Sequence, residues 1–333
     1  MAMKRGNLSA PWRIILLILP PVVGLACLGI GRIPIAPAEI LTALTGGEVP
    51  KMTAMTLWNL RLPRILLAAL VGAGLSTAGC AFQSLFANPL ATPDTLGVAS
   101  GASFGAALGL LLGFSILGVQ LTALIMGAAA VALTWLAGSG KNRGLSTIVL
   151  AGIMMGSLFN ALVSLVKFVA DEESQLPAIT YWLMGGLNNA AYETLLLGTP
   201  PILIGMFVLY LLRWRMNLLP LSDDEARASG VNITALRGAT VVCATMITAS
   251  CVSMCGQVGW VGLLIPHMCR MKFGSNHLSL LPASISLGAA FMIIVDTVAR
   301  SASAQEIPVS ILTAIIGAPF FILLMRRSGG WSL

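Results

Sequence analysis

The sequence predicts an all-α polytopic membrane protein with about ten transmembrane helices, some of them short or broken, and with both termini in the cytoplasm. Three observations carry this expectation: the composition, the series of apolar runs and the distribution of basic residues. Hydrophobic residues make up 57% of the 333 residues and charged residues only 9%, against roughly 25% charged residues in an average soluble domain. A water-soluble fold is therefore excluded, and we expect residues 1–333 to form a single transmembrane domain.

The apolar runs are long enough to cross a hydrocarbon core of ~30 Å, which takes ~20 helical residues. We expect spans at residues 12–30, 65–86, 96–113, 117–137, 146–166, 194–212, 238–255, 258–269, 280–299 and 308–325. Helix breakers at Asn88-Pro89 and from Gly259 to Pro266 interrupt the series, and irregular backbone at membrane depth must be buried or line a cavity. Each break follows a helix rich in small residues, which suggests two related halves.

The basic residues set the orientation. With the N-terminus inside, 13 of the 19 lysines and arginines fall on the inner side, and this excess is typical of the cytoplasmic face. The six on the outer side are Arg32, Lys51, Arg61, Arg64, Lys167 and Arg300. The formal charge of +7 is scattered between apolar runs without aromatic interleaving, so it does not indicate a nucleic-acid partner.

Small residues predict close helix packing. One stripe recurs every fourth residue in the third span, and a second cluster lies in the span before it. Their members are Gly97, Gly101, Gly105, Gly109 and Gly113 in the stripe, and Gly72, Gly74, Ser76, Ala78 and Gly79 in the cluster. Such glycines let another backbone approach closely. We also expect Gln83 to hydrogen-bond across helices.

The sequence lacks the residues that nucleotide binding and metal binding require. Gly138 to Asn142 has neither the upstream glycine nor the Ser or Thr of a phosphate-binding loop. Cys251 and Cys255 share a helix face without a nearby histidine or carboxylate, and His267 has no partner at metal-ligand spacing. We therefore expect no catalytic residue, metal site or cofactor in this chain, and a structural role for His267 at a helix end.

The longest inward loop, residues 218–230, predicts a short helix outside the membrane. Ser222 is suited to cap it, Glu225 completes a capping box, and Gly230 ends it. The apolar residues that precede Ser222 favour a structured knob that docks into a partner. A solvated loop is the alternative.

Motifs along nearly the whole chain resemble a known family. In order they are LRLPR, GAGLSTAGCAFQSLFANPLATPDTLGVASGA, LSTIVLAGI, YWLMGGL, NLLPLSDDEARASGV, GWVGLLIPHMCR, LLPASISLGAAFMIIVDTVAR and IPVSILTAIIGAPFFILLMRR. They resemble the permease family of ABC importers for iron-siderophore, haem and cobalamin complexes, the FecCD-like membrane subunits of type II importers. The resemblance implies a ten-helix permease in the bacterial cytoplasmic (inner) membrane that is not itself an enzyme.

The resemblance also implies partners. The permease would pair with a second copy, identical or homologous, and would be served by two ATPase subunits that hold ATP and Mg and by a substrate-binding protein outside. Segment 218–230 matches the family's coupling segment, with Leu221, Asp223, Asp224, Ala226, Arg227 and Gly230 as the residues that meet the ATPase. Asn88, Leu90, Ser146 and Thr147 match positions near the cytoplasmic gate.

Arg61, Arg64 and Arg300 match arginines that receive acidic residues of the binding protein. Arg61 and Arg64 are three residues apart, so both lie on one helical face if the helix starts that early. Fixed guanidinium groups can grip carboxylates bidentately. The alternative is that the three arginines anchor lipid phosphates at the membrane interface.

The expected cargo is an iron complex, a siderophore or haem, because this is the commonest cargo among such permeases. Cobalamin or an oxyanion remains an alternative within the same family. An ion-coupled secondary transporter is less well supported, since Asp296, Lys167 and Asp171 form no evident intramembrane relay. A membrane enzyme would need a polar catalytic cluster at one depth, which the sequence does not offer.

Overall fold

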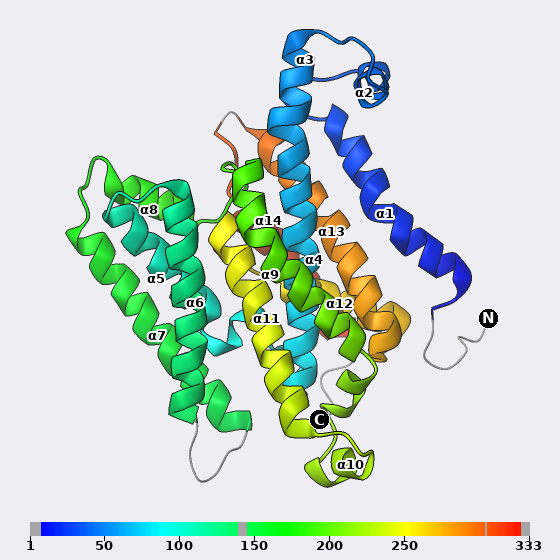
Figure 1. The fold of residues 1–333 in the computed structure, drawn as a ribbon, viewed down its shortest axis with the longest axis vertical. Helices are drawn as coiled ribbons and strands as arrows, with labels where there is room; N and C mark the ends of the chain where they lie inside the picture. Colours follow the sequence, from blue (N-terminus) through cyan, green and yellow to red (C-terminus); the bar gives the residue numbers. More distant parts are fainter. Residues whose placement is uncertain (1–7, 139–144, 304, 328–333) are drawn as a thin grey trace.

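The computed structural model describes residues 8–138, 145–303 and 305–327, and every regular element in these ranges is helical. Each predicted span corresponds to one helix, and these helices run along the long axis of the molecule (Figure 1). They are α1 (Ala10–Gly29), α4 (Leu62–Leu85), α5 (Val98–Leu111), α6 (Ile116–Gly138), α7 (Leu145–Val169), α9 (Tyr192–Leu212), α11 (Ile233–Cys255), α12 (Val261–Phe273), α13 (His277–Ala302) and α14 (Val309–Arg327). The predicted all-α polytopic fold is confirmed.

Within the described ranges, seven helical segments are long and apolar enough to cross a membrane. The two helices that follow the predicted breaks are shorter, with 14 residues in α5 and 13 in α12. A helix of 14 residues rises only ~21 Å, less than a ~30 Å hydrocarbon core. Other parts of the chain must therefore complete the crossing at α5 and α12.

Short helices cover the two ends of the molecule. At the upper end in Figure 1 lie α2 (Pro37–Leu44) and α3 (Lys51–Met55), and α8 (Gln175–Leu183) lies lower, beside the upper ends of α5, α6 and α7. At the lower end lies α10 (Asp223–Ala228), preceded by the 3₁₀ turn η3 (Arg215–Leu218). The capping residues of segment 218–230 predict α10. No sequence pattern predicts α2, α3 or α8, because these helices are too short to leave an apolar span.

The predicted start of the second span at residue 65 is too late. The helix runs without interruption from Lys51 to Leu85 and includes a π-helical turn, η1 (Thr56–Arg61), just before α4. The residues from 51 to 64 are more polar than the span that follows, so hydropathy alone does not show that they continue the helix.

α4 is the central helix. In the most apolar stretch of each helix, 83% of the residues are buried in α4 and 78% in α11, against 22% in α1, α7 and α9. A Cβ atom on Gly72 would lie 2.1 Å from the Gly288 carbonyl oxygen, and one on Gly79 would lie 1.8 Å from that of Gly262. The predicted close approach is therefore confirmed, with α13 and α12 as the neighbours of α4.

The glycine stripe of α5 faces α6. A Cβ atom on Gly101 would lie 2.5 Å from the Ala130 Cβ, and one on Gly105 would lie 2.3 Å from the Thr122 carbonyl oxygen. Gly113 differs from the rest of the stripe, because its Cβ would meet nothing within 4 Å and its φ is +70°. It ends the helix in the left-handed conformation that glycine favours.

The two predicted breaks lie side by side in the fold. They contain the two non-glycine residues with positive φ in the described chain, Ala87 (47°) after α4 and Trp260 (68°) before α12. Gln83 joins the end of α4 to the start of α12: its amide approaches the carbonyl oxygens of Gly262 and Leu263 at 3.5 and 3.4 Å. The expectation that Gln83 bonds across helices is thus confirmed.

His267 has a structural environment, but the prediction that it marks a helix end is wrong. α12 begins at Val261 and continues to Phe273, so Pro266 and His267 lie inside it. The His267 ring packs edge-on against Phe321 of α14, with 5.6 Å between ring centroids. The expectation depended on Pro266 as a helix breaker, and the structure accommodates this proline in the helix.

Candidate docking, coupling and gating sites

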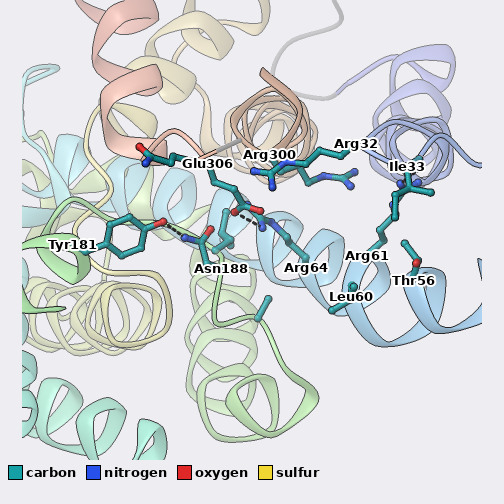
Figure 2. Close-up of a pocket in the computed structure, with 14 residues that line it drawn as sticks. Arg32, Ile33, Thr56, Leu60, Arg61, Arg64, Tyr181, Asn188, Arg300 and Glu306 are labelled. Atoms are coloured by element: carbon teal, nitrogen blue, oxygen red, sulfur yellow. Dashed lines mark hydrogen bonds and ion pairs between the residues drawn. The ribbon is translucent and has the colours of Figure 1, made fainter. Parts of the chain in front are cut away.

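A cavity of 730 Å³ opens at the end of the molecule that carries α3 (Figure 2). Its lining comes from the start of α4, the end of α13, the loop after α1 and the loops that precede α9 and α14. It contains the three arginines singled out in the sequence, Arg61, Arg64 and Arg300, together with Arg32 and Glu306. Arg61 and Arg64, around the start of α4, thus meet the distant Arg300 of α13 at one cavity, which we call the arginine cavity.

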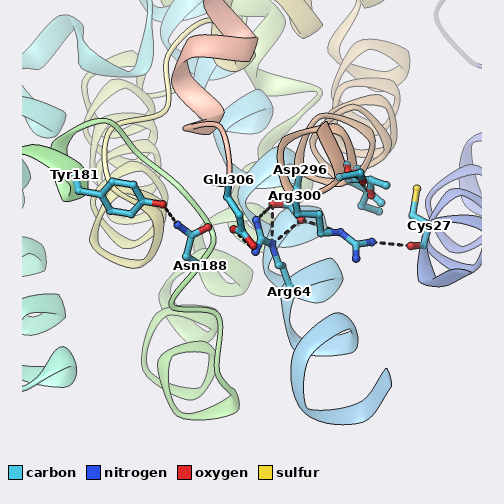
Figure 3. Close-up of polar contacts among 10 residues, drawn as sticks. Cys27, Arg64, Tyr181, Asn188, Asp296, Arg300 and Glu306 are labelled. Carbon is cyan, nitrogen blue, oxygen red and sulfur yellow. Dashed lines mark hydrogen bonds and ion pairs between the residues drawn. The ribbon is translucent and has the colours of Figure 1, made fainter. Parts of the chain in front are cut away.

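Arg64 is held by two carboxylates (Figure 3). Its Nε and Nη2 atoms lie 2.9 Å from Asp296 Oδ1, and its Nη1 atom donates to Glu306 Oε2 at 2.8 Å. The Asp296 side chain is 1% exposed and that of Glu306 is 27% exposed. A charge as deeply buried as Asp296 requires such partners, because an unpaired buried carboxylate is strongly unfavourable.

Arg61 and Arg300 tie α1 to the centre of the molecule. Arg61 donates to the carbonyl oxygens of Leu28 and Ile33, and Arg300 donates to that of Cys27 at 2.7 Å. The last carbonyls of a helix have no partner within it and carry partial negative charge. The two arginines therefore satisfy the end of α1 and hold it against α4 and α13.

The three arginines differ from the sequence expectation in their exposure. Arg61 is 5% exposed and Arg300 is 8% exposed, and all three have partners within the chain. Figure 2 shows Arg61 extending toward Ile33 and Arg64 toward Glu306, so the two side chains do not form one outward face. Asp296 stands four residues before Arg300 in an apolar span, and this i,i+4 spacing is the sequence signal that could have indicated a buried ion pair.

The predicted helix in segment 218–230 is confirmed as α10. The Ser222 amide and hydroxyl both approach Glu225 Oε2, at 3.2 and 2.9 Å, and the Glu225 amide lies 3.4 Å from Ser222 Oγ. This is the reciprocal capping box that the sequence predicts. Gly230 follows with φ +72°. The side chains of Asp223 and Arg227 lie outside the described residues.

α10 packs against the hydrophobic core of its own chain. Ala226 is fully buried and Leu219 is 1% exposed, whereas Leu221 is 39% exposed and Asp224 is also exposed. Among the described coupling residues, Leu221, Asp224 and Gly230 therefore face outward and Ala226 faces inward. A larger residue at Ala226 would disturb this chain before it reached any partner.

Hydrogen bonds fix the turn before α10. The Ser84 hydroxyl at the end of α4 donates to the Met216 carbonyl at 3.0 Å. Asn217 bonds the start of α13, accepting from the His277 amide at 2.9 Å and donating to Asn276 Oδ1 at 3.2 Å. The turn before α10 is thereby hydrogen-bonded to α4 and α13, the helices that also form the arginine cavity.

The four predicted gate residues are exposed. Asn88 and Leu90 lie past the end of α4 that is remote from the arginine cavity, and the Asn88 side chain accepts from the Leu90 amide at 2.9 Å. Leu90 is 44% exposed. Ser146 and Thr147 lie in the first turn of α7. Figure 1 shows that this end of α7 and α10 lie at the same end of the molecule.

No cluster that could hold a metal is found among the described residues. A search of these ranges finds no group of three or more His, Cys, Asp and Glu side chains with suitable geometry. The six cysteines are all buried, and none is in a disulfide. The conspicuous polar features of the described chain are thus the arginine cavity and the α10 end.

The fold and these two ends define a polytopic membrane protein with a short helical knob at one end. Residues 16–327 match the FecCD transport family. The chain is 42% identical over 94% of its length and 94% of the relative's to the molybdate import system permease protein MolB of Haemophilus influenzae. It is 38% identical, over 82% of both chains, to a probable iron chelatin transport system permease protein of Helicobacter pylori.

A third relative is the Fe(3+) dicitrate transport system permease protein FecC of Escherichia coli, 35% identical over 89% of this chain and 91% of that one. Among solved structures, one described as a metal-chelate type ABC transporter in an inward-facing conformation matches with a TM-score of 0.88 at 39% identity. That match covers 96% of this chain and 100% of the other. PsaBC from Streptococcus pneumoniae matches at a TM-score of 0.59 and 14% identity, which shows a related fold.

The chain therefore belongs to the FecCD family. It is a permease subunit of an ABC importer, a multi-pass protein of the bacterial cytoplasmic membrane and not an enzyme.

Proposed function

We propose that the chain pairs with a second permease, identical or homologous, to enclose a translocation path, and that two ATPase subunits with ATP and Mg drive it. The observation that carries this proposal is the separation of two sites at opposite ends of the same helices. α10 and the residues just before it present Asp224 and Leu221 at one end, and the arginine cavity lies at the other. A substrate-binding protein would deliver cargo at the arginine cavity, and the ATPase would engage α10.

Docking of the binding protein would replace one of the two carboxylates that Arg64 binds. Arg64 is shared between the buried Asp296 and the partly exposed Glu306. A carboxylate of the binding protein could replace Glu306 on Arg64 without leaving Asp296 unpaired. Arg61 and Arg300 would keep α1 and α13 in place around the exchange, and Arg32 at the exposed rim would add a steering charge.

We infer an oxyanion of the molybdate type as cargo, in place of the iron complex expected from the sequence. The support is the 42% identity to a molybdate permease over 94% of both chains. The charge of the arginine cavity agrees with an anion, since four arginines and one glutamate line it. An iron chelate is the second candidate, supported by relatives at 38% and 35% identity that are named for iron chelatin and ferric dicitrate.

The test is reconstitution of the permease with its ATPase in proteoliposomes. Binding proteins loaded with molybdate, a ferric siderophore, ferric dicitrate, haem or cobalamin would be added in turn, with each unloaded binding protein as its control. We expect the molybdate-loaded protein to stimulate ATP hydrolysis and uptake. Stimulation only by a binding protein loaded with an iron chelate would mean that the cargo is an iron complex and not an oxyanion. If no loaded binding protein stimulates ATP hydrolysis, the proposed importer assembly is contradicted.

A further inference from the structure

A second cavity, of 860 Å³, lies between α1, α4, α9 and α13 on the side of the molecule away from the α5–α7 helices. Its walls are apolar and include Leu17, Leu70, Leu203 and Ile285, one from each helix. Leu17 is 77% exposed and Leu203 is 52% exposed, so the cavity opens on the flank of the helices and not at either end. We call it the flank groove.

The flank groove has one basic end. Arg13, in the first turn of α1, and Arg213, which directly follows α9, both line it. Arg13 uses Nε to bond the Leu8 carbonyl at 3.0 Å, and Arg213 uses Nη1 to bond the Tyr210 carbonyl. A guanidinium has five N–H donors, so both retain donors for a further ligand. The described residues that line the groove include no Asp or Glu.

The groove has the length of one membrane leaflet. Along α13 it extends from Leu278 to Ala289, which is about 16 Å at 1.5 Å per residue. Half of a ~30 Å hydrocarbon core is ~15 Å. The groove therefore has the length of a lipid acyl chain, and its basic end lies where the lipid head group would be.

Aromatic and basic residues show where the membrane interface lies. Trp12 packs edge-on against Phe273 at 5.3 Å, and Lys272 Nζ lies 4.4 Å from the Trp12 ring centroid. Trp214, next to Arg213, is 55% exposed. Tryptophan and basic residues concentrate at the level of lipid head groups. Arg13 and Arg213 are therefore at head-group depth, in the leaflet on the side of α10.

We propose that the flank groove binds one anionic phospholipid, with its phosphate on Arg13 and Arg213 and an acyl chain along Leu17, Leu70 and Leu203. Basic pockets between helices on the cytoplasmic side suit such head groups. The lipid would fill the space between α1 and α9. α1 needs this support, since only 22% of its apolar stretch is buried by protein although its end holds Arg61 and Arg300.

The experiment is native mass spectrometry of the purified full-length permease in detergent, titrated with phosphatidylglycerol or phosphatidylcholine of identical acyl chains. We expect one phosphatidylglycerol to remain bound preferentially. Replacing both arginines (Arg13→Gln with Arg213→Gln) should lower that affinity roughly 30-fold, at ~1 kcal/mol for each cation. Arg215→Gln is the matched control, because Arg215 is exposed at the same end but does not line the groove.

A second variant tests the acyl-chain part. Leu203→Trp places a ring in the open groove from an exposed position, so it should lower retention of both lipids without unfolding the chain, which size-exclusion chromatography would verify. Equal phosphatidylglycerol affinity in wild type and the double arginine variant would overturn the proposal. So would loss of dimerisation in Leu203→Trp with lipid binding unchanged, since that result would assign the groove to a second copy of the chain.

Discussion

At the residue scale, Asp296 is the buried carboxylate that pairs with two arginines of the arginine cavity. It is 1% exposed, bonds Arg64 through both oxygens and lies 3.9 Å from Arg300 Nε. A buried pair adds little net stability compared with apolar residues of the same shape, but removing one partner leaves the other charge buried alone. Asp296 therefore holds the geometry of the cavity through both arginines.

Replacing Asp296 by Asn should destabilise the permease by ~3–5 kcal/mol, because Arg64 and Arg300 would lose their buried counter-charge. Thermal unfolding of the purified protein in detergent measures this loss. Glu172→Gln is the control, since Glu172 is exposed in the loop between α7 and α8 and undergoes the same change from acid to amide. An unfolding temperature equal to that of wild type would show that the pair is not structural.

Replacing Glu306 by Gln should strengthen docking of the binding protein. The change frees Arg64 Nη1 from a partly exposed partner while Asp296 stays in place. For an ion pair of ~1 kcal/mol the expected gain in affinity is about fivefold, measured by titrating the binding protein onto the permease complex.

Glu48→Gln, an exposed site between α2 and α3 at the same end, controls for the change in net charge. A fall in affinity for Glu306→Gln would instead mean that Glu306 itself contacts the binding protein. Charge reversal at Arg61 or Arg300 is a poor test of docking, because both side chains are buried and support α1.

At the element scale, glycines make α4 the hub of the fold. Gly72 and Gly79 allow the backbones of α13 and α12 to lie against it with no side chain between. Such contacts exclude lipid and give dense packing in a membrane, where the hydrophobic effect does not drive helices together.

Gly79→Ala should destabilise the fold by ~1–3 kcal/mol, since its methyl group would have to displace the backbone of Gly262. Gly238→Ala is the matched control in α11, where a Cβ atom meets nothing within 4 Å. There the change should be neutral or stabilising by up to ~1 kcal/mol. Detergent-solubilised yield and unfolding temperature compare the two, and an equal effect of both would refute the packing argument.

α10 is the element expected to meet the ATPase. The exposed Leu221, two residues before α10, should contribute apolar area to that contact, so Leu221→Asp should reduce co-purification of the ATPase and abolish transport while the permease still folds. The control is Leu41→Asp, an exposed leucine of α2 at the opposite end. Full co-purification with Leu221→Asp would exclude this residue from the interface.

At the scale of the whole molecule, the two ends are linked by α4 and α13. Both helices contribute to the arginine cavity, and both are bonded to the turn before α10 through Ser84, Asn217 and His277. Gln83, near the end of α4, bonds the first turn of α12, which follows the irregular segment after α11. A rigid-body movement of the central helices could therefore couple the ATPase end to the exposed residues proposed as the gate.

Cysteines placed at Leu90 and Thr147 should change their rate of labelling by a maleimide between the nucleotide-free and ATP-bound complexes. The six native cysteines are buried, so background labelling should be low. Leu44→Cys is the control, since Leu44 and Leu90 are both 44% exposed and Leu44 lies on α2 at the other end. Unchanged labelling rates at both positions would show that neither residue belongs to a moving gate.

The sequence alone predicts the spanning helices, their approximate limits, the glycine contacts, the capping box of α10 and the family, but not the short helices α2, α3 and α8. These features depend on local sequence pattern, because apolar runs, four-residue spacing and cap residues can be recognised within a single segment. Only the tertiary structure decided that Arg61, Arg64 and Arg300 are buried and bonded within the chain, that Ala226 faces inward and that Arg13 and Arg213 share the flank groove. Each of these facts depends on which distant segments meet, and Arg64 meets Asp296 across 232 positions of sequence, a pairing that local pattern does not record.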